Sequence, residues 1–506
     1  MLPLPTELWL LIGAYLSPHD LLTAIQVNYM FHSCLIPVLY RDFVICGGCP
    51  RTTGPFPWRN SWKPVRKMSK AQYIERTFAT IKRIQCSSVL MDAIKSCTLC
   101  HFEHREPRNE ATIADALEQV LQEAVTFISR LPHCSDIVVE MVHVEIRQLK
   151  QLIHHQSRPV NLTVQRCTIL DGDSTHLSID SQHQCLLKNL TIAWIKGSKQ
   201  TAYEFVEWSM CRGLQSLSLR NFEPLPLFRT RWAQKSFPNL RRLELVCAYD
   251  FDCTQVLARL PVLEELCFQG HSAPLELPLT ILPRLRLFEG SGYHARSIIP
   301  GRPISALHIL GDHKALLNAG MDPPAASNFG STTSILELSI TGRTPAELIE
   351  HARITRLCAS LQVLRLSSYF PFPTMNVNAV SVRSTYEEAG SPRGQNTFTV
   401  KYIHELYRLK HLRHLDFKFC CHVPSNRALA WERSMCEAFR TRSAPNIHHV
   451  SFSLLVEWDR VPYDTTWIPS GEGVSANLVQ NPGENEWTYS LMAEAQWPEA
   501  PFPVDE

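Results

Sequence analysis

The sequence predicts an α/β protein in which a short helical module precedes a solenoid, a curved parallel sheet with helices on its outer side. Two observations lead to this prediction. Along the middle of the chain, apolar residues recur at positions 1, 4 and 6 of a six-residue pattern. At its start, the chain has two apolar runs separated by a Pro-containing turn. A strand followed by a helix, when repeated, stacks on its neighbours and builds a one-dimensional array.

Composition supports an ordered protein that needs more than one compact core. The chain has 506 residues, of which 45% are hydrophobic and 19% charged, and its formal net charge is +2. This length exceeds what one hydrophobic core usually serves. The near-zero charge excludes a partner that is bound through the electrostatics of the whole chain.

The apolar spacing recurs ten times, once in a degenerate form. Successive starts from Leu187 to Leu285 are 27, 26, 23 and 22 residues apart. These gaps match the roughly 20–29-residue period of leucine-rich repeats. The copies are Leu187-Leu190-Ile192, Leu214-Leu217-Leu219, Leu240-Leu243-Leu245, Leu263-Leu266-Phe268, Leu285-Phe288, Ile304-Leu307-Ile309, Ile335-Leu338-Ile340, Leu361-Leu364-Leu366, Leu412-Leu415-Phe417 and Ile447-Val450-Phe452.

The repeats are irregular, and we assign them to a leucine-rich-repeat-like solenoid over residues 131–460. The asparagine that usually follows the strand in such repeats is present as Asn221 but is missing from most copies. An ordinary α/β domain with a leucine-rich parallel sheet is the alternative. Helices are expected between the strands, at Thr201–Arg212, Thr254–Leu260, Pro345–Leu357 and Arg427–Arg440.

The first 45 residues predict a helical hairpin. Leu8, Ile12 and Tyr15 fall on one helical face, and Ser17-Pro18-His19-Asp20 breaks the first helix and supplies a cap for the second. A second apolar run follows, until Pro37 ends or kinks it. A unit this short cannot bury all of its apolar residues alone, so a remaining apolar face is expected to meet another domain or chain.

This stretch resembles the F-box. The matching motifs are Leu4-Pro5-Thr6-Glu7, Leu16-Ser17-Pro18-His19-Asp20-Leu21 and Val27-Asn28-Tyr29-Met30-Phe31. They cover about a tenth of the chain, and the ending Pro37-Val38-Leu39-Tyr40-Arg41 is typical of fungal members. Phe31 stands where many members have Trp. An ordinary hairpin buried on its own core is the alternative.

The resemblance implies a function and a docking face. An F-box packs on a Skp-type adaptor, which holds a cullin and a RING protein, so the chain would be a substrate-receptor subunit of a ubiquitin ligase. The residues expected to contact the adaptor are Leu4, Pro5, Leu8, Ile12, Leu16, Leu21, Leu22 and Val27.

Two further regions flank the solenoid. Residues 46–130 are predicted to be a helical linker that caps the open end of the array, with an amphipathic helix over Ala111–Arg130. Residues 461–506 contain eight acids and no Lys or Arg, and are rich in Pro, Gly and Glu. This composition predicts an acidic, disordered tail.

Two chemical motifs are weighed and set aside. Cys46-x-x-Cys49 and Cys97-x-x-Cys100 could supply four thiolates for zinc, but the pairs lie further apart than in short zinc modules, and we expect no metal. The stretch Arg51–Arg83 mixes nine cations with aromatic residues, which could hold single-stranded nucleic acid. A solvated linker is the more frequent role of such a stretch.

Motifs of catalysis and of membrane insertion are missing from the sequence. It has no G-x-S-x-G, P-loop or H-E-x-x-H, and no run of roughly 20 apolar residues. We expect a non-catalytic protein without a cofactor, located in the cytoplasm or nucleus, where its 17 cysteines would stay reduced.

The target of the solenoid is expected to bind the concave face of the sheet. Strand side chains alternate, so the residues that flank the second and third apolar positions point to that face. Signs are mixed, and the sequence does not name a target. A scaffold that acts with the adaptor outside a ligase and a nucleic-acid-binding solenoid are the alternative functions. The candidate target-binding residues are Arg220, Arg242, Glu244, Arg365, Asp416 and Lys418.

Overall fold

The structure is a computed structural model of the chain. It divides into two compact units, the first over 1–263 with 270–273 and the second over 264–269 with 274–506. The residues that it describes are 6–47, 70–102, 111–154, 158–170, 186–197, 199–209, 213–221, 237–246, 253–270, 277–310, 335–342, 360–368, 409–419, 436, 446–451, 457–460, 467–470, 474–480 and 487–491.

Unit 1 opens with three helices, α1 (Thr6–Tyr15), α2 (Pro18–Ala24) and α3 (Tyr29–Leu39), where the sequence predicted a hairpin of two; the second apolar run divides into α2 and α3. The Ser17 side chain caps α2 by accepting a hydrogen bond from the Asp20 backbone N–H, at 3.2 Å. Asn28 caps α3 in the same way, accepting from the Phe31 N–H at 2.9 Å. Short polar side chains therefore satisfy free N–H groups at the start of both helices, and the cap on α2 is the one that the sequence predicts.

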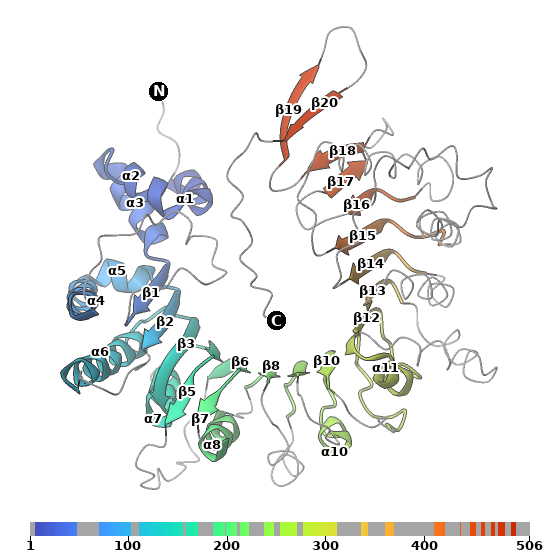
Figure 1. The fold of residues 1–506 in the computed structure, drawn as a ribbon, viewed down its shortest axis with the longest axis horizontal. Coiled ribbons are helices and arrows are strands. Elements are labelled where there is room, and N and C mark those ends of the chain that lie inside the picture. The colour runs from blue at the N-terminus through green and yellow to red at the C-terminus, as the bar shows by residue number, and fades with distance from the viewer. Residues whose placement is uncertain are drawn as a thin grey trace, which may run out of the picture. The chain divides into compact units, whose positions relative to one another are not determined.

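A parallel sheet follows the helices in unit 1 (Figure 1). Each strand pairs in parallel with the next in the order β1, β2, β3, β4, β6, β8, β9. The strands are β1 (Asp42–Cys46), β2 (Ser96–Phe102), β3 (Asp136–Glu145), β4 (Val160–Gln165), β6 (Leu187–Ala193), β8 (Ser216–Arg220) and β9 (Arg242–Val246).

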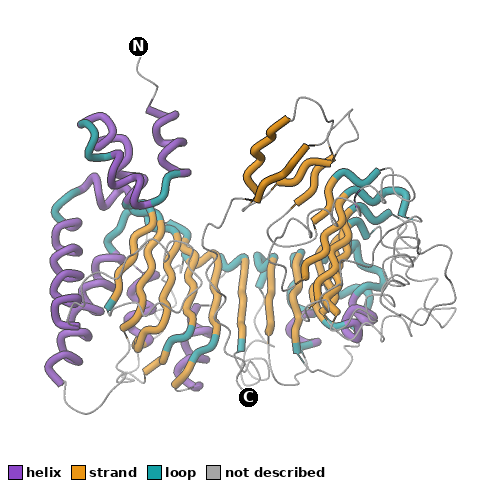
Figure 2. Tube along the Cα trace, turned by 45° about the horizontal axis from the view of Figure 1, so that its top comes forward, coloured by secondary structure: helices purple, strands orange, loops and turns teal. Residues whose placement is uncertain are grey.

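Helices cover one face of this sheet. They lie side by side along the strands, and α6, α7 and α8 pack on β2, β3 and β5 (Figures 1 and 2). The opposite face, here called the polar face, carries the alternate side chains of each strand. The helices are α4 (Lys70–Gln85), α5 (Ser88–Ala93), α6 (Ala111–Ser129), α7 (Ile146–His154), α8 (Lys199–Ser209) and α10 (Thr254–Leu257).

A second, narrow parallel sheet adjoins the first. The C-terminal part of β3 pairs with β5 (Thr168–Leu170), and β5 pairs with β7 (Lys196–Gly197). Gly197 has a φ of +101°, and a Cβ there would lie 2.3 Å from the Ile169 carbonyl oxygen. Only glycine fits so close to the neighbouring backbone.

Unit 2 continues the same pattern. Its parallel strands pair in the order β10 to β16, and β17 and β18 then add antiparallel strands. Helix α11 (Gly292–Ile298) contacts β11 and β12. The strands are β10 (Glu265–Gln269), β11 (Leu287–Gly290), β12 (Ala306–Leu310), β13 (Glu337–Gly342), β14 (Val363–Ser368), β15 (His414–Phe419), β16 (His449–Ser451), β17 (Glu457–Arg460) and β18 (Trp467–Ser470).

All ten apolar repeats coincide with strands of these sheets. Their second positions align in register: Leu190, Leu217 and Leu243 in unit 1, and Leu266 through Val450 in unit 2. The first position of every copy is also buried. The predicted α/β solenoid-like parallel sheet is therefore confirmed. The helices expected at Pro345–Leu357 and Arg427–Arg440 lie almost wholly outside the described residues.

The sheet begins earlier than the repeat pattern indicates. β1 and β2 lie in regions that we assigned to the helical module and to the helical linker over 46–130, so the linker contains a strand of the sheet besides its helices. The same spacing is present there with cysteine in place of leucine: Ile94-Cys97-Leu99 and Cys134-Ile137-Val139 are all buried. A free cysteine fills a core position as a small hydrophobe does.

A buried arginine secures the turns around α11. Arg302 is 1% exposed. Its Nε donates to the Ile281 carbonyl at 2.8 Å, and Nη2 to the Pro278 carbonyl at 2.9 Å. Nη1 donates to the Ile298 carbonyl at 2.6 Å, at the end of the helix. One guanidinium thus satisfies carbonyl oxygens from two separate loops, which only its forked geometry allows.

The prediction of a disordered tail is wrong in part. β18 pairs with β17, and β19 (Val474–Gln480) pairs antiparallel with β20 (Trp487–Leu491). Trp487, Tyr489 and Leu491 alternate with polar residues, a strand signal that the acidic composition obscured. No helix in the described part of the chain is long and apolar enough to cross a membrane.

Candidate functional site

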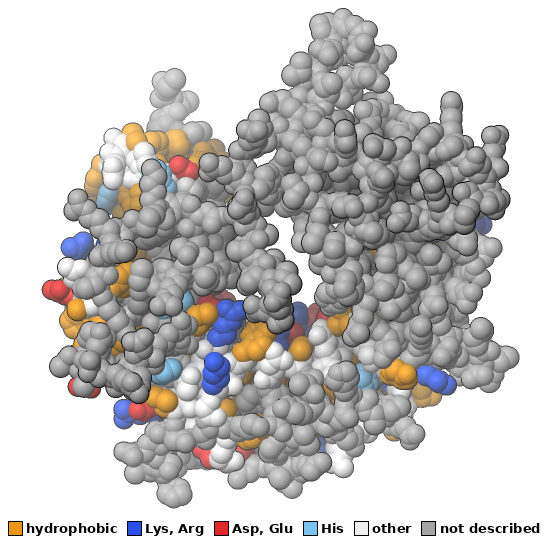
Figure 3. Space-filling view, viewed as in Figure 1, with side chains coloured by type: hydrophobic (Ala, Val, Ile, Leu, Met, Phe, Trp, Pro, Cys, Tyr) orange, Lys and Arg blue, Asp and Glu red, His pale blue; other side chains and the backbone are white. Residues whose placement is uncertain are grey.

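Helix α1 carries an exposed apolar stripe. Leu8, Leu11, Ile12 and Tyr15 follow at i, i+3, i+4 and i+7, so they share one helical face. Their exposed fractions are 42%, 56%, 41% and 85%. A surface helix normally places polar residues there. We call these four residues the α1 stripe, and Figure 3 shows hydrophobic side chains at the surface of this helical module.

The opposite face of α1 packs on α3. The Trp9 and Phe31 rings meet edge to face, with centroids 4.5 Å apart. A Cβ on Gly13 would lie 2.8 Å from Leu35 Cδ2, so glycine is what lets the two helices approach. The aromatic residue that stands at the usual Trp position of the F-box pattern therefore fills the interior of the hairpin.

The structure sorts the predicted adaptor-binding residues into three groups. Leu8, Ile12, Leu22 and Val27 are exposed. Leu16, which directly follows α1, is half-buried, and Leu21 is only 5% exposed. Leu21 is therefore a core residue of the hairpin, and its assignment to the docking face is wrong. The last two, Leu4 and Pro5, lie outside the described residues.

On the polar face of unit 1, the predicted target-binding residues pair with each other. The Arg220 guanidinium lies 2.7 Å from Glu244 Oε1, and Ser218 donates to Glu244 Oε2 at 2.9 Å. Glu244 is buried, while Arg242, which precedes it by two residues, is exposed. Glu244 therefore holds Arg220 in place and does not itself meet solvent.

Next to this pair, a ladder of amide side chains crosses three strands. Asn161 donates to Asp136 at 2.6 Å, and Asn189 donates to Asn161 at 2.7 Å. Polar side chains at neighbouring positions on successive strands therefore satisfy one another's hydrogen-bonding groups.

Unit 2 carries a ladder of alternating charge on its polar face. Arg365 lies between two carboxylates, paired with Glu337 and, at 3.0 Å, with Asp416. His308 lies 3.7 Å from Glu289 and 3.1 Å from Glu337. We call these five residues the unit 2 charge ladder. At its far end, His449 contacts Asp416 at 3.7 Å and Asp459 at 2.8 Å.

The predicted candidates Arg365 and Asp416 are thus partners within the unit 2 charge ladder. Lys418, the last candidate, lies on β15 in a stretch whose backbone alone is described. A target that binds Arg365 or Asp416 has to compete with, or extend, an existing network of ion pairs.

The network changes the acidity of its members. Burial lowers the pKa of His308, but the Glu289 and Glu337 carboxylates, which accept hydrogen bonds from its ring, outweigh this, and the pKa is raised above its ordinary value of 6.5. Hydrogen bonding by His308 in turn lowers the pKa of Glu289. His414, beside His449, has a lowered pKa because of burial and of that neighbouring histidine.

A pH dependence of stability follows. Because His308 has a raised pKa in the fold, its stabilising contribution is complete below pH 6.5 and is lost as pH rises through the higher folded value. We expect His308→Gln to lose roughly 0.5–1 kcal/mol more stability at about pH 6 than at about pH 8. Urea unfolding at both values measures this, with His32→Gln, an exposed histidine, as the matched control. An equal loss at both values would contradict the assignment.

The described cysteines of the two motifs lie on both faces of the sheet. Cys97 points toward the helices and Cys100 toward the polar face, where Cys100 is the register partner of Cys46. Cys49 lies outside the described residues. Burial and the nearby Cys134 raise the pKa of Cys97, and burial raises the pKa of Cys134 to about 12. Both thiols are therefore neutral core groups and poor metal ligands.

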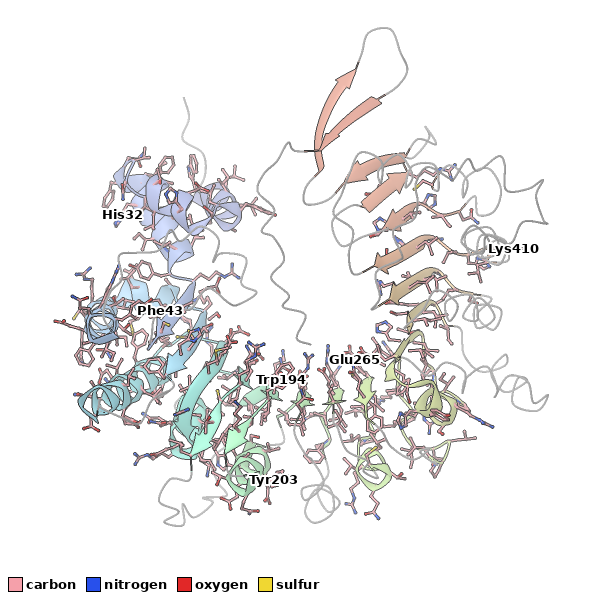
Figure 4. All side chains as sticks on the ribbon, viewed as in Figure 1. His32, Phe43, Trp194, Tyr203, Glu265 and Lys410 are labelled. Atoms are coloured by element: carbon pink, nitrogen blue, oxygen red, sulfur yellow. The ribbon has the colours of Figure 1, made fainter. Side chains whose placement is uncertain are left out.

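Sequence reasoning missed one prominent surface group. Trp194 is 45% exposed and lies on the side of β6 away from α8, which carries Tyr203 (Figure 4). It stands two residues after Ile192, as Asn221 stands two residues after Leu219. Aligning the repeats at that position would have found it.

Comparison with known proteins adds little. No protein-family model and no curated protein matches the chain. It is similar to a solved structure described as "Crystal structure of TLR13-ssRNA13 complex", at 13% identity and a TM-score of 0.28, over 66% of this chain and 41% of that one. The chain spans about two-fifths of that structure, and a TM-score this low carries no argument about arrangement or function.

The class of the protein rests on its own strands. Parallel strands with aligned apolar positions, and helices on one face of the sheet in unit 1, define a leucine-rich-repeat-like α/β protein. Such solenoids generally serve as scaffolds that bind proteins or other ligands. The helical module at its N-terminus is the feature from which a more specific function has to be argued.

Proposed function

We propose that the chain is the substrate-receptor subunit of a Skp-cullin-F-box ubiquitin ligase. The helices α1–α3 hold a Skp-type adaptor, and through it a cullin and a RING protein, while the solenoid holds a target protein. The chain supplies no chemistry of its own. It raises the rate of ubiquitin transfer by keeping the target close to the conjugating enzyme.

The observation that carries this proposal is the apolar surface of the helical module. Sixteen large hydrophobic residues are exposed in the described part of the chain, and nine of them lie between Leu8 and Met30. A hairpin with its own core would not leave so many apolar side chains in water. Covering the α1 stripe contributes roughly 1 kcal/mol or more for each side chain.

The sequence motifs support the same helical module. Leu-Pro-x-Glu and Leu-Ser-Pro-x-Asp-Leu give the resemblance to the F-box, and Ser17 and Asn28 cap the helices α2 and α3 of this module. The docking face that we propose differs from the one expected from the motifs. It contains Leu11 and Tyr15, and it excludes Leu21.

The polar faces of the sheets are the proposed target surface. They carry the paired residues Arg220 and Glu244 in unit 1, and the unit 2 charge ladder. The nucleic-acid alternative depends on the stretch Arg51–Arg83, most of which lies outside the described residues, and no observation favours it. The proposal places the chain in the cytoplasm or nucleus.

Reconstitution tests the proposal. The full chain is mixed with a purified Skp-type adaptor, and then with a cullin–RING pair, and each mixture is run on a sizing column with light scattering. We expect a complex of all components. Binding of the adaptor without the cullin would favour a scaffold outside a ligase. A chain that leaves the adaptor unbound would contradict the proposal.

A further inference from the structure

Five residues in unit 1 share an unusual backbone conformation at equivalent places. His101, Met141, Arg166, Trp194 and Asn221 have φ values between 50° and 59°, although none of them is glycine. Each stands two residues after a buried apolar residue of β2, β3, β4, β6 or β8, in order Leu99, Val139, Val164, Ile192 and Leu219. Left-handed conformations are uncommon outside glycine and cost free energy.

Backbone hydrogen bonds explain why this conformation persists. The Arg166 N–H donates to the Ala193 carbonyl at 2.9 Å, and the Trp194 N–H donates to the Arg220 carbonyl at 3.1 Å. The Asn221 N–H donates to the Val246 carbonyl at 2.7 Å, so these three left-handed residues each bond to the end of the neighbouring strand. After Met141 and Arg166 the chain turns from the main sheet into the narrow sheet that contains β5. These residues thus form a corner between the two sheets.

The corner places a tryptophan beside an arginine at the surface. The Arg166 guanidinium lies over the Trp194 ring, 5.8 Å from its centroid. Arg220 ends β8, the strand next to β6, which Trp194 follows. Tryptophan and arginine are the residues that contribute most often to binding energy at protein interfaces.

At this corner, two buried carboxylates lie beneath two more exposed arginine side chains. Glu140 lies 3.7 Å from Arg166, and Glu244 lies 2.7 Å from Arg220. The two carboxylates are 9% and 8% exposed, whereas the two arginine side chains are 47% and 44% exposed. The acids therefore lie at the base and hold the guanidinium groups, which are the more exposed partners of each pair.

We propose that Arg166, Trp194 and Arg220 form a binding hot spot for an acidic segment of a protein partner. Carboxylates of the segment would bind the two arginines, and an aromatic side chain would stack on Trp194. Each arginine is already balanced by its own buried glutamate, so the site suits a few carboxylates better than the dense charge of a nucleic-acid backbone. The inference deepens the proposed function by naming the chemistry of the target.

Fluorescence anisotropy with defined probes tests this proposal on the full chain. The probes are a labelled peptide of alternating Glu and Tyr, matched Lys–Tyr and Glu–Ser peptides, and a labelled oligouridine. We expect the Glu–Tyr peptide to bind more tightly than the other three. Tighter binding of the Lys–Tyr peptide or of oligouridine would overturn the proposal, as would the absence of binding by the Glu–Tyr peptide.

Variants locate the binding. Trp194→Ala should weaken binding of the Glu–Tyr peptide roughly tenfold or more, and Arg166→Gln by a smaller factor. Trp194→Phe, which keeps a ring, should retain most of it. Tyr293→Ala is the matched control, because that aromatic side chain is 50% exposed in unit 2. Binding that Trp194→Ala leaves unchanged, or that Tyr293→Ala weakens equally, would overturn the assignment.

Failure of this inference can be told apart from failure of the proposed function. Trp194 lies on the sheet and outside the helices α1–α3, so Trp194→Ala should keep the adaptor bound and the melting temperature unchanged. Loss of the peptide with retention of the adaptor supports both proposals. Retention of peptide binding by a chain that does not bind the adaptor would contradict only the proposed function.

Discussion

The variant Leu8→Glu/Ile12→Glu is expected to abolish binding of a Skp-type adaptor while leaving the chain folded. Both side chains are more than 40% exposed, so glutamate is tolerated in the free protein. In the complex, each carboxylate would have to leave water for an apolar contact, at a cost of about 2 kcal/mol or more. Two such costs weaken binding roughly a thousandfold. Titration calorimetry with purified adaptor measures the change.

A matched control separates docking from general surface effects. Leu279→Glu introduces the same charge at an apolar side chain that is 63% exposed in unit 2. It should bind the adaptor as tightly as the wild type does. Adaptor binding that survives in the folded double variant would show that the α1 stripe is not the docking face.

The largest effect on stability is expected at Arg302. Replacing it with methionine keeps much of the volume but removes the donors for the carbonyls of Pro278, Ile281 and Ile298. Buried carbonyl groups without partners cost about 1–3 kcal/mol each, and water can satisfy some of them. We expect Arg302→Met to lower the free energy of unfolding of unit 2 by about 3–5 kcal/mol. Urea unfolding followed by circular dichroism measures it.

Two further variants test whether the forked shape of the guanidinium is what stabilises these turns. Arg302→Lys keeps the charge but lacks the fork, so it should recover only part of the lost stability. Arg296→Met removes an exposed arginine in the last turn of α11 and should change stability by about 0.5 kcal/mol or less. Equal stability of Arg302→Met and the wild type would show that the buried guanidinium is dispensable.

The repeats were predictable because leucine spacing and burial coincide. Each of the ten copies became a strand, since its apolar residues fall on one face of an extended chain. The earlier strands β2 and β3 were missed because cysteine replaces leucine at Cys97 and Cys134, and a thiol also suggested metal chemistry. Composition misled the interpretation of the tail, where alternation in Trp487–Leu491 was the better signal.

The docking face and the hot spot differ in how much the sequence could tell. Helical periodicity predicted that Leu8, Ile12 and Tyr15 share a face. Whether Leu21 is buried or exposed depends on how α1 and α2 pack on α3, which the periodicity does not tell. Trp194 could not be placed from strand alternation alone. Its left-handed conformation interrupts that alternation, and its contact with Arg166 joins two strands that are distant in sequence.

Hydrogen exchange of the full chain, with and without a purified Skp-type adaptor, tests the central claim most directly. We predict that the adaptor slows exchange in the backbone of α1 and α2, around the α1 stripe and Leu22. Strands β10 to β16 should exchange at the same rate in both states. Unchanged exchange throughout residues 6–39, or protection found only in the sheets, would contradict the claim that the N-terminal helices are the adaptor-docking module.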